Sequence, residues 1–233
     1  MSSALINQLK KSAACEAVTF IKSGMIVGLG TGSTAFYAVE EVGRLLREGK
    51  LKDIICVSTS EATETQARSL DIPMTTLNEI SYVDVAIDGA DEVTNDLQLT
   101  KGKGAALFRE KSVEILAKKL IIIVDQTKMV KKIASKEWIP VEVAPFGWKN
   151  TSKRLETLGC IPHLRMMKNS DEPLKTDNQN YILDCEYPNG IEDPVSMGKS
   201  IKSVVGVLEH GLFCNMATNV IIASTEGLKQ LSK

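Results

Sequence analysis

The stretch MIVGLGTGSTA, residues 25–35, joins a short apolar run to a segment with helical periodicity. The run Met25–Val27 is typical of a buried strand, and a glycine-rich turn separates it from a helix that is expected to begin at Ala35. A strand, a tight turn and a helix in this order begin a βαβ unit, in which a second parallel strand follows. This stretch therefore predicts an α/β fold with a parallel sheet.

The alternation of strands and helices continues through the first half of the chain. Helices are predicted over residues 5–21, 35–47, 62–70 and 104–118. Strands are predicted over residues 25–28, 54–57, 73–76, 83–87 and 120–124. This order is that of a Rossmann-like α/β domain with a parallel sheet.

The rhythm changes beyond Val130. Strands are predicted over 141–144, 161–167, 181–186 and 207–212, helices over 150–158 and 194–204, and a polar connection over 168–180. The order β-α-β-β-α-β is the ferredoxin-like split unit. A last strand over 219–223, followed by a short helix, is expected to return to the first sheet. We therefore predict a Rossmann-like catalytic domain over 1–129 and 208–233, and a smaller inserted ferredoxin-like α+β domain over 130–207.

The composition is that of an average globular protein, with 43% hydrophobic residues, 24% charged residues and a formal net charge of -1. This balance predicts neither a nucleic-acid partner nor a membrane partner. No apolar stretch of signal-peptide length opens the sequence, so we expect a cytoplasmic protein. The five cysteines are widely spaced and only two histidines accompany them, which predicts reduced thiols rather than disulfides or a zinc site.

The glycine-rich turn departs from two known phosphate-binding patterns. The dinucleotide fingerprint requires a glycine at the sixth position counted from Gly28, where Ser33 stands, and the P-loop requires a lysine after Gly32. What remains is a strand, a turn and hydroxyl side chains at a helix N-terminus, where free N–H groups and the helix dipole favour a single phosphate. The alternative is an ordinary turn in which Ser33 or Thr34 caps the helix.

Carboxylates cluster in VDVAIDGADEV, residues 83–93. The predicted strand ends at Asp88, and Asp91 and Glu92 follow closely. The cluster therefore lies beyond the carboxyl end of this strand, where open α/β sheets bind their ligands. Such a cluster suits a magnesium ion or general acid–base catalysis. The alternative is an Asp-Gly turn with solvated acids.

A second glycine-rich helix entry lies in LTKGKGAALFREK, residues 99–111. Lys101 supplies a positive charge for the carboxylates, and the loop continues with Gly102, Lys103 and Gly104. Glu110 is predicted on or beside the apolar stripe of the following helix, where partial desolvation would suit a base. The alternative is that Glu110 reaches solvent from the edge of that stripe.

These motifs, in this order, resemble those of the type A family of ribose-5-phosphate isomerases. The resemblance extends over STSEAT at 58–63, VDQTKMV at 124–130, VEVAP at 141–145 and GLF at 211–213, and so covers nearly the whole chain. The family has a Rossmann-like domain with an inserted ferredoxin-like domain, which agrees with the predicted elements.

The resemblance also implies the site residues. Glu110 would be the catalytic base, and Asp88, Asp91 and Lys101 would take part in catalysis. The substrate-binding residues would be Thr31, Gly32, Ser33 and Thr34 of the turn, Asp88, Gly89, Ala90 and Asp91, the loop Lys101, Gly102, Lys103 and Gly104, and Lys128, which taken alone reads as a solvated lysine. The family's loop commonly reads Lys-Gly-Gly-Gly. Lys103 replaces its middle glycine, which raises the question of the backbone conformation at that position.

The implied reaction interconverts an aldose and a ketose, ribose 5-phosphate and ribulose 5-phosphate, in the non-oxidative pentose phosphate pathway. One carboxylate can move the proton between neighbouring carbons through an enediolate, while Lys101 with Asp88 and Asp91 supplies charge and proton transfer. The reaction requires no metal and no redox cofactor. The resemblance further implies a small-molecule sugar phosphate as the partner, without nucleic acid or membrane, and a homodimer or homotetramer.

Two other functions are compatible with parts of this pattern. An amino-sugar phosphate isomerase-deaminase would be expected to place a histidine in its site, but His163 and His210 lie outside the motifs. A sugar-phosphate sensor without catalysis would need the phosphate turn but not Glu110 with Lys101, and no DNA-binding module accompanies it. The pattern therefore favours catalysis.

Overall fold

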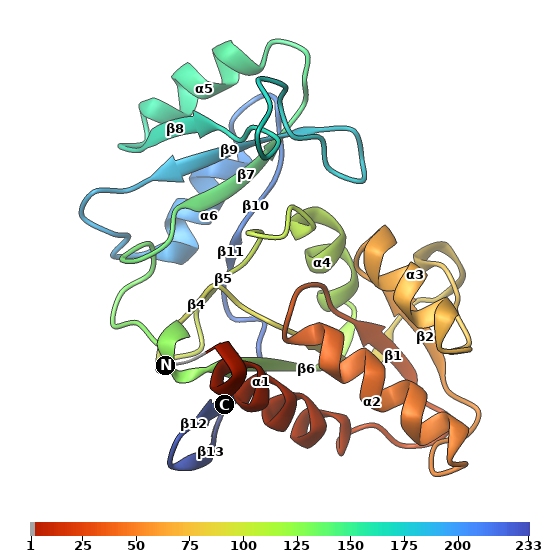
Figure 1. Cartoon of the computed structure of the whole chain (residues 1–233). Coiled ribbons are helices and arrows are strands. Elements are labelled where there is room, and N and C mark those ends of the chain that lie inside the picture. Colours follow the sequence, from red (N-terminus) through yellow and green to blue (C-terminus); the bar gives the residue numbers. More distant parts are fainter. Residues whose placement is uncertain (1–2) are drawn as a thin grey trace. The chain divides into compact units, whose positions relative to one another are not determined.

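A computed structural model of the chain describes residues 3–233, which form two compact units (Figure 1). The first unit contains the chain up to Ala90, Arg109–Met129 and Asn215–Lys233, and the second contains Asp91–Phe108 and Val130–Cys214. The predicted boundaries differ from these units: residues 91–108 and 208–214 were predicted in the first domain, whereas they belong to the second unit. Strand pairing is the reason: β5 (Leu99–Thr100) hydrogen-bonds to both β4 (Glu92–Val93) and β11 (Leu212–Phe213).

The first unit is built on a six-stranded sheet in the order β13-β12-β6-β3-β1-β2. Five neighbouring strands are parallel: β1 (Ile26–Leu29), β2 (Ile55–Ser58), β3 (Val83–Asp88), β6 (Ala117–Asp125) and β12 (Asn219–Ser224). The helices are α1 (Ser3–Val18), α2 (Ala35–Arg47), α3 (Glu61–Ser69) and α4 (Leu107–Glu114), with short 3₁₀ turns η1 (Leu77–Glu79) and η2 (Gln126–Lys128).

Burial explains this layering. The centre of β6, Leu120–Val124, is an unbroken run of buried aliphatic residues, as expected of a strand in a parallel sheet that is covered on both faces. Its Ile121 and Ile123 belong to a core that also contains Ala13 and Ala17 of α1. The small alanine side chains let α1 lie close to the sheet and beside α2 (Figure 1). The predicted α/β fold with a parallel sheet is confirmed.

Three details of the first unit differ from the prediction. The short helix expected after the last strand is wrong, because Gly227–Ser232 forms β13, which pairs antiparallel with β12. The strand near 73–76 is reduced to a single bridge between Met74 and Cys56. The helix over 104–118 is shorter than predicted, because Ala117 already pairs with Val83 of β3 and therefore belongs to β6. The return of β12 to the first sheet, beside β6, is confirmed.

The second unit holds a four-stranded antiparallel sheet in the order β10-β7-β9-β8. Its elements follow the chain as β7 (Ile139–Val143), α5 (Trp148–Glu156), β8 (Ile161–Leu164), β9 (Tyr181–Glu186), α6 (Pro194–Lys202) and β10 (Val207–His210). The fourth strand lies beside the first, and the third lies between the first and the second. This is the β-α-β-β-α-β arrangement predicted from the sequence.

The two faces of this sheet carry different residues. Val141, Val143 and Leu183 point into a core that includes Leu155 of α5 and Ile201 of α6. Because side chains alternate along a strand, the residues between them lie on the face without these helices. On that face Glu142 is fully buried, and its Oε1 accepts hydrogen bonds from the side chains of Thr176, Asn178 and Asn180. The C-terminal end of the polar connection 168–180 is therefore hydrogen-bonded to the sheet.

None of the helices within residues 3–233 combines the length and apolar character that crossing a bilayer requires.

Candidate active site

Three segments of the candidate site follow neighbouring strands of the first unit. The turn Thr31–Thr34 comes after β1, Asp88 ends β3, and Lys128 lies in η2 directly after β6. Because β1, β3 and β6 are parallel neighbours, their carboxyl ends meet at one edge of the sheet. Ligands of open α/β sheets bind at this edge.

Asp88 holds the turn in place. Its carboxylate is buried, and Oδ1 accepts hydrogen bonds from the N–H groups of Thr31 at 3.0 Å and Gly89 at 2.6 Å. A Cβ atom at Gly30 would lie 2.2 Å from the carboxyl carbon of Asp88, so only glycine allows this approach. Asp88 is thus a fixed carboxylate rather than the solvated acid of an exposed turn.

A cluster of hydroxyl groups fixes the Thr31 side chain. Its Oγ1 lies 2.7 Å from Thr59 Oγ1, 2.9 Å from Ser60 Oγ and 3.2 Å from Thr63 Oγ1. Thr63 in turn donates to the carbonyl of Gly30. The Thr31 hydroxyl therefore anchors the turn internally. The sequence signal for this cluster was STSEAT after β2, but its residues were not assigned to the site.

The outer side of the turn is suited to an anion. Within the described residues 3–233, the N–H groups of Gly32, Ser33, Thr34 and Ala35 donate no hydrogen bond. Thr34 is the N-cap of α2, but its hydroxyl makes no capping bond there. Lys10 Nζ lies 2.8 Å from Ser33 Oγ and adds a positive charge. Free donors, a helix N-terminus and a cation are the features that favour an anion such as a phosphate.

Glu110 is buried on the inner face of α4, with only 5% of its surface exposed. Val113, three residues later, lies on the same face of the helix and packs against Gly28 of β1. Of the two alternatives for Glu110, the buried position is therefore confirmed. A carboxylate held away from bulk water against the sheet is in the environment that a proton-transferring base requires.

The lysine loop, residues 101–104, lies in the second unit. Lys101 is buried, its N–H donates to the carbonyl of Gly211, and its Nζ lies 5.4 Å from the centre of the Phe213 ring. Gly102 has a φ of +108°, and a Cβ atom there would approach Leu107 at 2.8 Å. This position requires glycine for both reasons.

The replacement of the usual middle glycine by Lys103 is accommodated. Among the described residues, the positions with a left-handed backbone in and next to this loop are Gly102 and Ala105, and Lys103 is not one of them. The N–H of Lys103 donates to Asp91 Oδ2 at 3.0 Å, while its ammonium group pairs with Glu137 at 2.8 Å. Lys103 therefore adopts an ordinary backbone conformation, and its exposed side chain pairs with Glu137.

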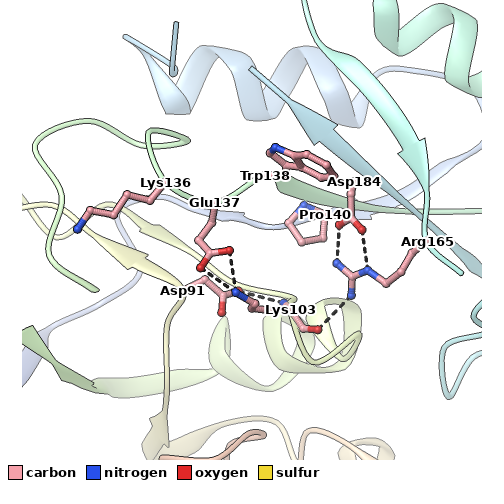
Figure 2. Close-up of a pocket in the computed structure, with 8 residues that line it drawn as sticks. All are labelled: Asp91, Lys103, Lys136, Glu137, Trp138, Pro140, Arg165 and Asp184. Carbon is pink, nitrogen blue, oxygen red and sulfur yellow. Dashed lines mark hydrogen bonds and ion pairs between the residues drawn. The ribbon is translucent and has the colours of Figure 1, made fainter. Parts of the chain in front are cut away.

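A cavity of about 320 Å³ adjoins this loop within the second unit. Figure 2 shows the paired side chains of Lys103 and Glu137, and Arg165 between Asp184 and the backbone of Lys103. The lining residues are Asp91, Lys103, Lys136, Glu137, Trp138, Pro140, Arg165 and Asp184. Sequence reasoning had assigned only Asp91 and Lys103 among them.

The predicted site residues thus form two groups. The turn Thr31–Thr34, Asp88–Ala90, Glu110 and Lys128 belong to the first unit, whereas Asp91 and Lys101–Gly104 belong to the second. Across residues 3–233, no three His, Cys, Asp or Glu side chains gather as they would around a metal ion. The carboxylates of Asp88 and Asp91 instead accept backbone N–H groups.

Both histidines have local roles. The ring of His163 stacks on Trp138 at 4.6 Å and lies near Glu186. His210 is buried against Gly198 of α6, and its Nδ1 accepts the N–H of Leu212. Neither arrangement supports the histidine-dependent deaminase alternative.

The α/β fold, the buried carboxylate of Glu110 and the free N–H groups of the turn are features expected of an α/β enzyme that acts on an anionic substrate. A family model for ribose 5-phosphate isomerase A (phosphoriboisomerase A) matches residues 55–227. Ribose-5-phosphate isomerase A of Synechococcus sp. (strain JA-3-3Ab) is 49% identical over 226 residues, which cover 97% of each chain. The enzyme of the same name from Bacillus mycoides (strain KBAB4) is 45% identical and covers 95% of this chain and 98% of its own.

Solved structures agree with the sequence comparisons. A D-ribose-5-phosphate isomerase in complex with phospho-erythronic acid superposes with a TM-score of 0.95 at 41% identity, covering 98% of this chain and 99% of the other. Ribose 5-phosphate isomerase A of Methanocaldococcus jannaschii gives a TM-score of 0.92 at 37% identity, covering 97% and 99%. The chain belongs to the ribose 5-phosphate isomerase A family and is an isomerase.

Proposed function

This chain interconverts ribose 5-phosphate and ribulose 5-phosphate, the reaction of its family in the pentose phosphate pathway. We propose that Glu110 is the base of this reaction and that Lys101 stabilises the charge that develops. The observation that carries the mechanism is the buried carboxylate of Glu110 on a helix that packs against the sheet. An aldose and its ketose differ by the position of one carbon-bound proton and one oxygen-bound proton. The essential group is therefore a base that can take a proton from carbon and return it.

Glu110 is that base. It removes the proton from C2 of ribose 5-phosphate, and the electrons of the broken C–H bond form the C1–C2 double bond of an enediolate. Glu110 then returns the proton to C1, while a proton moves between the two oxygens, which yields ribulose 5-phosphate. A single carboxylate suffices because the two carbons are neighbours.

The negative charge that develops on oxygen requires a fixed positive charge. Lys101 provides it, since this lysine is buried and the neighbouring Gly102 is closely packed against Leu107 and Pro140. Asp88 and Asp91 assist the proton transfer between the oxygens. Electron movement is confined to the substrate, so no redox cofactor takes part, and Lys101 supplies the positive charge that a metal ion would otherwise supply.

The phosphate group binds at the turn after β1. The free N–H groups of residues 32–35, the hydroxyls of Ser33 and Thr34, and Lys10 are the donors. Lys128 binds the substrate from η2, and the backbone of Gly89, Ala90, Gly102, Lys103 and Gly104 completes the binding residues, as the family resemblance implies. We also propose that the enzyme is cytoplasmic and works as a homodimer or homotetramer.

A coupled assay of ribose 5-phosphate conversion tests the assignment of the base. Glu110→Gln keeps the size of the side chain but removes its ability to accept a proton. A positioned base contributes roughly 10²- to 10⁴-fold, so we expect kcat to fall by about that factor with KM largely unchanged. Exchange of the substrate's C2 hydrogen with solvent deuterium should stop in the same variant.

Glu114→Gln is the matched control, because Glu114 is a second buried glutamate on the same helix. It should keep kcat and the exchange rate. Exchange at the wild-type rate in Glu110→Gln would mean that another group, Asp88 foremost, is the base.

A further inference from the structure

We propose that Arg165 is a positioning residue that holds the lysine loop in its catalytic conformation. This inference rests on the proposed role of Lys101. Arg165 follows β8 and lies in the second unit, as does the loop. Family resemblance did not point to Arg165.

The guanidinium group of Arg165 binds a carboxylate on one side and the loop on the other (Figure 2). Its Nε donates to Asp184 Oδ2 at 2.8 Å, and its Nη2 donates to Asp184 Oδ1. Its Nη1 donates to the carbonyl oxygens of Gly102 at 3.0 Å and Lys103 at 3.1 Å. Arg165 thus connects β9 to two consecutive peptide groups of the loop.

The ion pair between Arg165 and Asp184 determines where the Nη1 donor of Arg165 points. A guanidinium group is planar and rigid, so a carboxylate that accepts from Nε and Nη2 also fixes where the N–H bonds of Nη1 point. Only 16% of the Arg165 side chain and 17% of the Asp184 side chain are exposed, so solvent screens this pair less than a surface pair. A lysine has neither the fork nor the second set of donors.

The sheet supports the loop beside this contact. Pro140 of β7 and Asp184 of β9 are register partners, so they lie on the same face of the sheet. That face is the one without α5 and α6. A Cβ atom at Gly102 would lie 3.2 Å from Pro140 Cγ, which places Gly102 directly over this surface. The loop is therefore held by packing at Pro140 and by hydrogen bonds at Arg165.

Without Arg165, two loop carbonyls lose a charged donor and Asp184 loses its counter-charge. The backbone that carries Lys101 would then occupy several conformations, of which only some place the ammonium group correctly. The observed rate falls with the fraction of molecules in the competent conformation. A misplacement of about 1 Å can cost roughly 100-fold, so we expect a loss in kcat of between about 10- and 100-fold.

The test compares three substitutions at Arg165. Arg165→Met keeps the apolar stem, Arg165→Lys keeps the charge, and Arg165→Ala makes room for a free guanidinium ion. Arg154→Met is the control, because Arg154 is an exposed arginine on α5, on the other side of the sheet. For each variant we would measure kcat and KM for ribose 5-phosphate and amide hydrogen exchange of the peptide that covers residues 99–106.

We expect all three variants to lower kcat more than they raise KM, with faster exchange in residues 99–106 than in the rest of the second unit. Millimolar guanidinium chloride should restore part of the activity of Arg165→Ala but none of that of Glu110→Gln. Arg165→Lys should not recover the wild-type rate, and Arg154→Met should match the wild type. A wild-type kcat in folded Arg165→Met, or a loss of kcat without faster loop exchange, would overturn the inference.

Two further variants distinguish a failure of this inference from a folding defect and from a failure of the proposed role of Lys101. If Arg165→Met fails to fold, Asp184→Asn tests the same contact, because it keeps the arginine but weakens its two hydrogen bonds to residue 184. An unchanged kcat together with unchanged loop exchange in Asp184→Asn would also overturn the inference. Lys101→Met tests the proposed function by itself. An active Lys101→Met enzyme would refute the role of Lys101, whereas the loop-exchange result for Arg165 would still report on positioning.

Discussion

Gly30→Ala should damage both the stability of the first unit and the binding of substrate. The added Cβ would lie 2.2 Å from the carboxyl carbon and from Oδ1 of Asp88, and 2.6 Å from its Cα. Because one of these atoms belongs to the backbone of β3, no rotation of the Asp88 side chain relieves the whole overlap. The turn, the strand or both must move.

The magnitude follows from two contributions. Overpacking of a close-packed region costs about 1–3 kcal/mol. Moving the turn away from Asp88 also weakens the hydrogen bond from the Thr31 N–H, and hydrogen bonds to a charged group contribute about 1.5–3 kcal/mol. We therefore expect the free energy of unfolding to fall by roughly 3 kcal/mol or more, a large fraction of the 5–15 kcal/mol typical of a domain.

Urea unfolding followed by circular dichroism measures the stability, and steady-state kinetics with ribose 5-phosphate measures the site. Gly49→Ala is the control: a Cβ atom there meets nothing within 4 Å, and the cost is limited to the strain of a φ of +68°, about 1–2 kcal/mol. Its kinetics should be those of the wild type. A loss of less than about 1 kcal/mol with unchanged KM in Gly30→Ala would refute the reasoning that Asp88 and the turn are locked together.

Three other predictions follow from the same geometry. Thr34→Val removes a free hydroxyl at the anion site and should raise KM by roughly 10-fold or more with a smaller change in kcat, whereas a collapse of kcat at constant KM would contradict the phosphate assignment. Activity should survive EDTA treatment, and a loss rescued by magnesium or zinc would show that the acids hold a metal. Hydrogen bonds from Lys118 and from the N–H of Ile26 lower the pKa of Asp84, so its contribution to stability is present above the ordinary aspartate pKa and is lost as the pH falls through the folded value. The stability difference between wild type and Asp84→Asn should therefore be constant from about pH 7 to about pH 5 and shrink as the pH falls below about 4, and an unchanged difference at the lowest pH would contradict this pairing.

Local sequence patterns predicted the elements whose hydrophobic period is unambiguous. The helix Ala35–Arg47 and the strand Tyr181–Glu186 have the predicted bounds, because each lies between clear turn signals. The boundary between α4 and β6 is not visible in the sequence, since AKKLIIIVD, residues 117–125, continues the apolar stripe of the preceding helix. Only pairing with β3 makes Ala117 a strand residue. The hairpin partner β13 was missed for the same reason: its exposed residues form a strand because β12 offers a free edge.

In the candidate site, too, some features were predictable from short sequence motifs and others were not. Short motifs contain the glycines, acids and lysines of the turn, of DGAD and of the loop, because close backbone approach and charge are properties of single residues. The burial of Glu110 was also predictable from its place on the helical stripe. By contrast, the hydroxyl cluster around Thr31 and the Arg165–Asp184 support of the loop join residues from separate segments.

The sequence by itself thus determined the α/β class, the order of the elements and the residue types that carry the chemistry, since these depend on periodicity and on local conformation. The tertiary structure decided which distant side chains meet. Arg165 and Gly102 are 63 positions apart, and Thr31 and Thr63 are 32 apart. Such contacts depend on how the strands that carry these segments pair. A shift of one residue in β9, for example, would turn Asp184 to the opposite face of its sheet and away from Arg165.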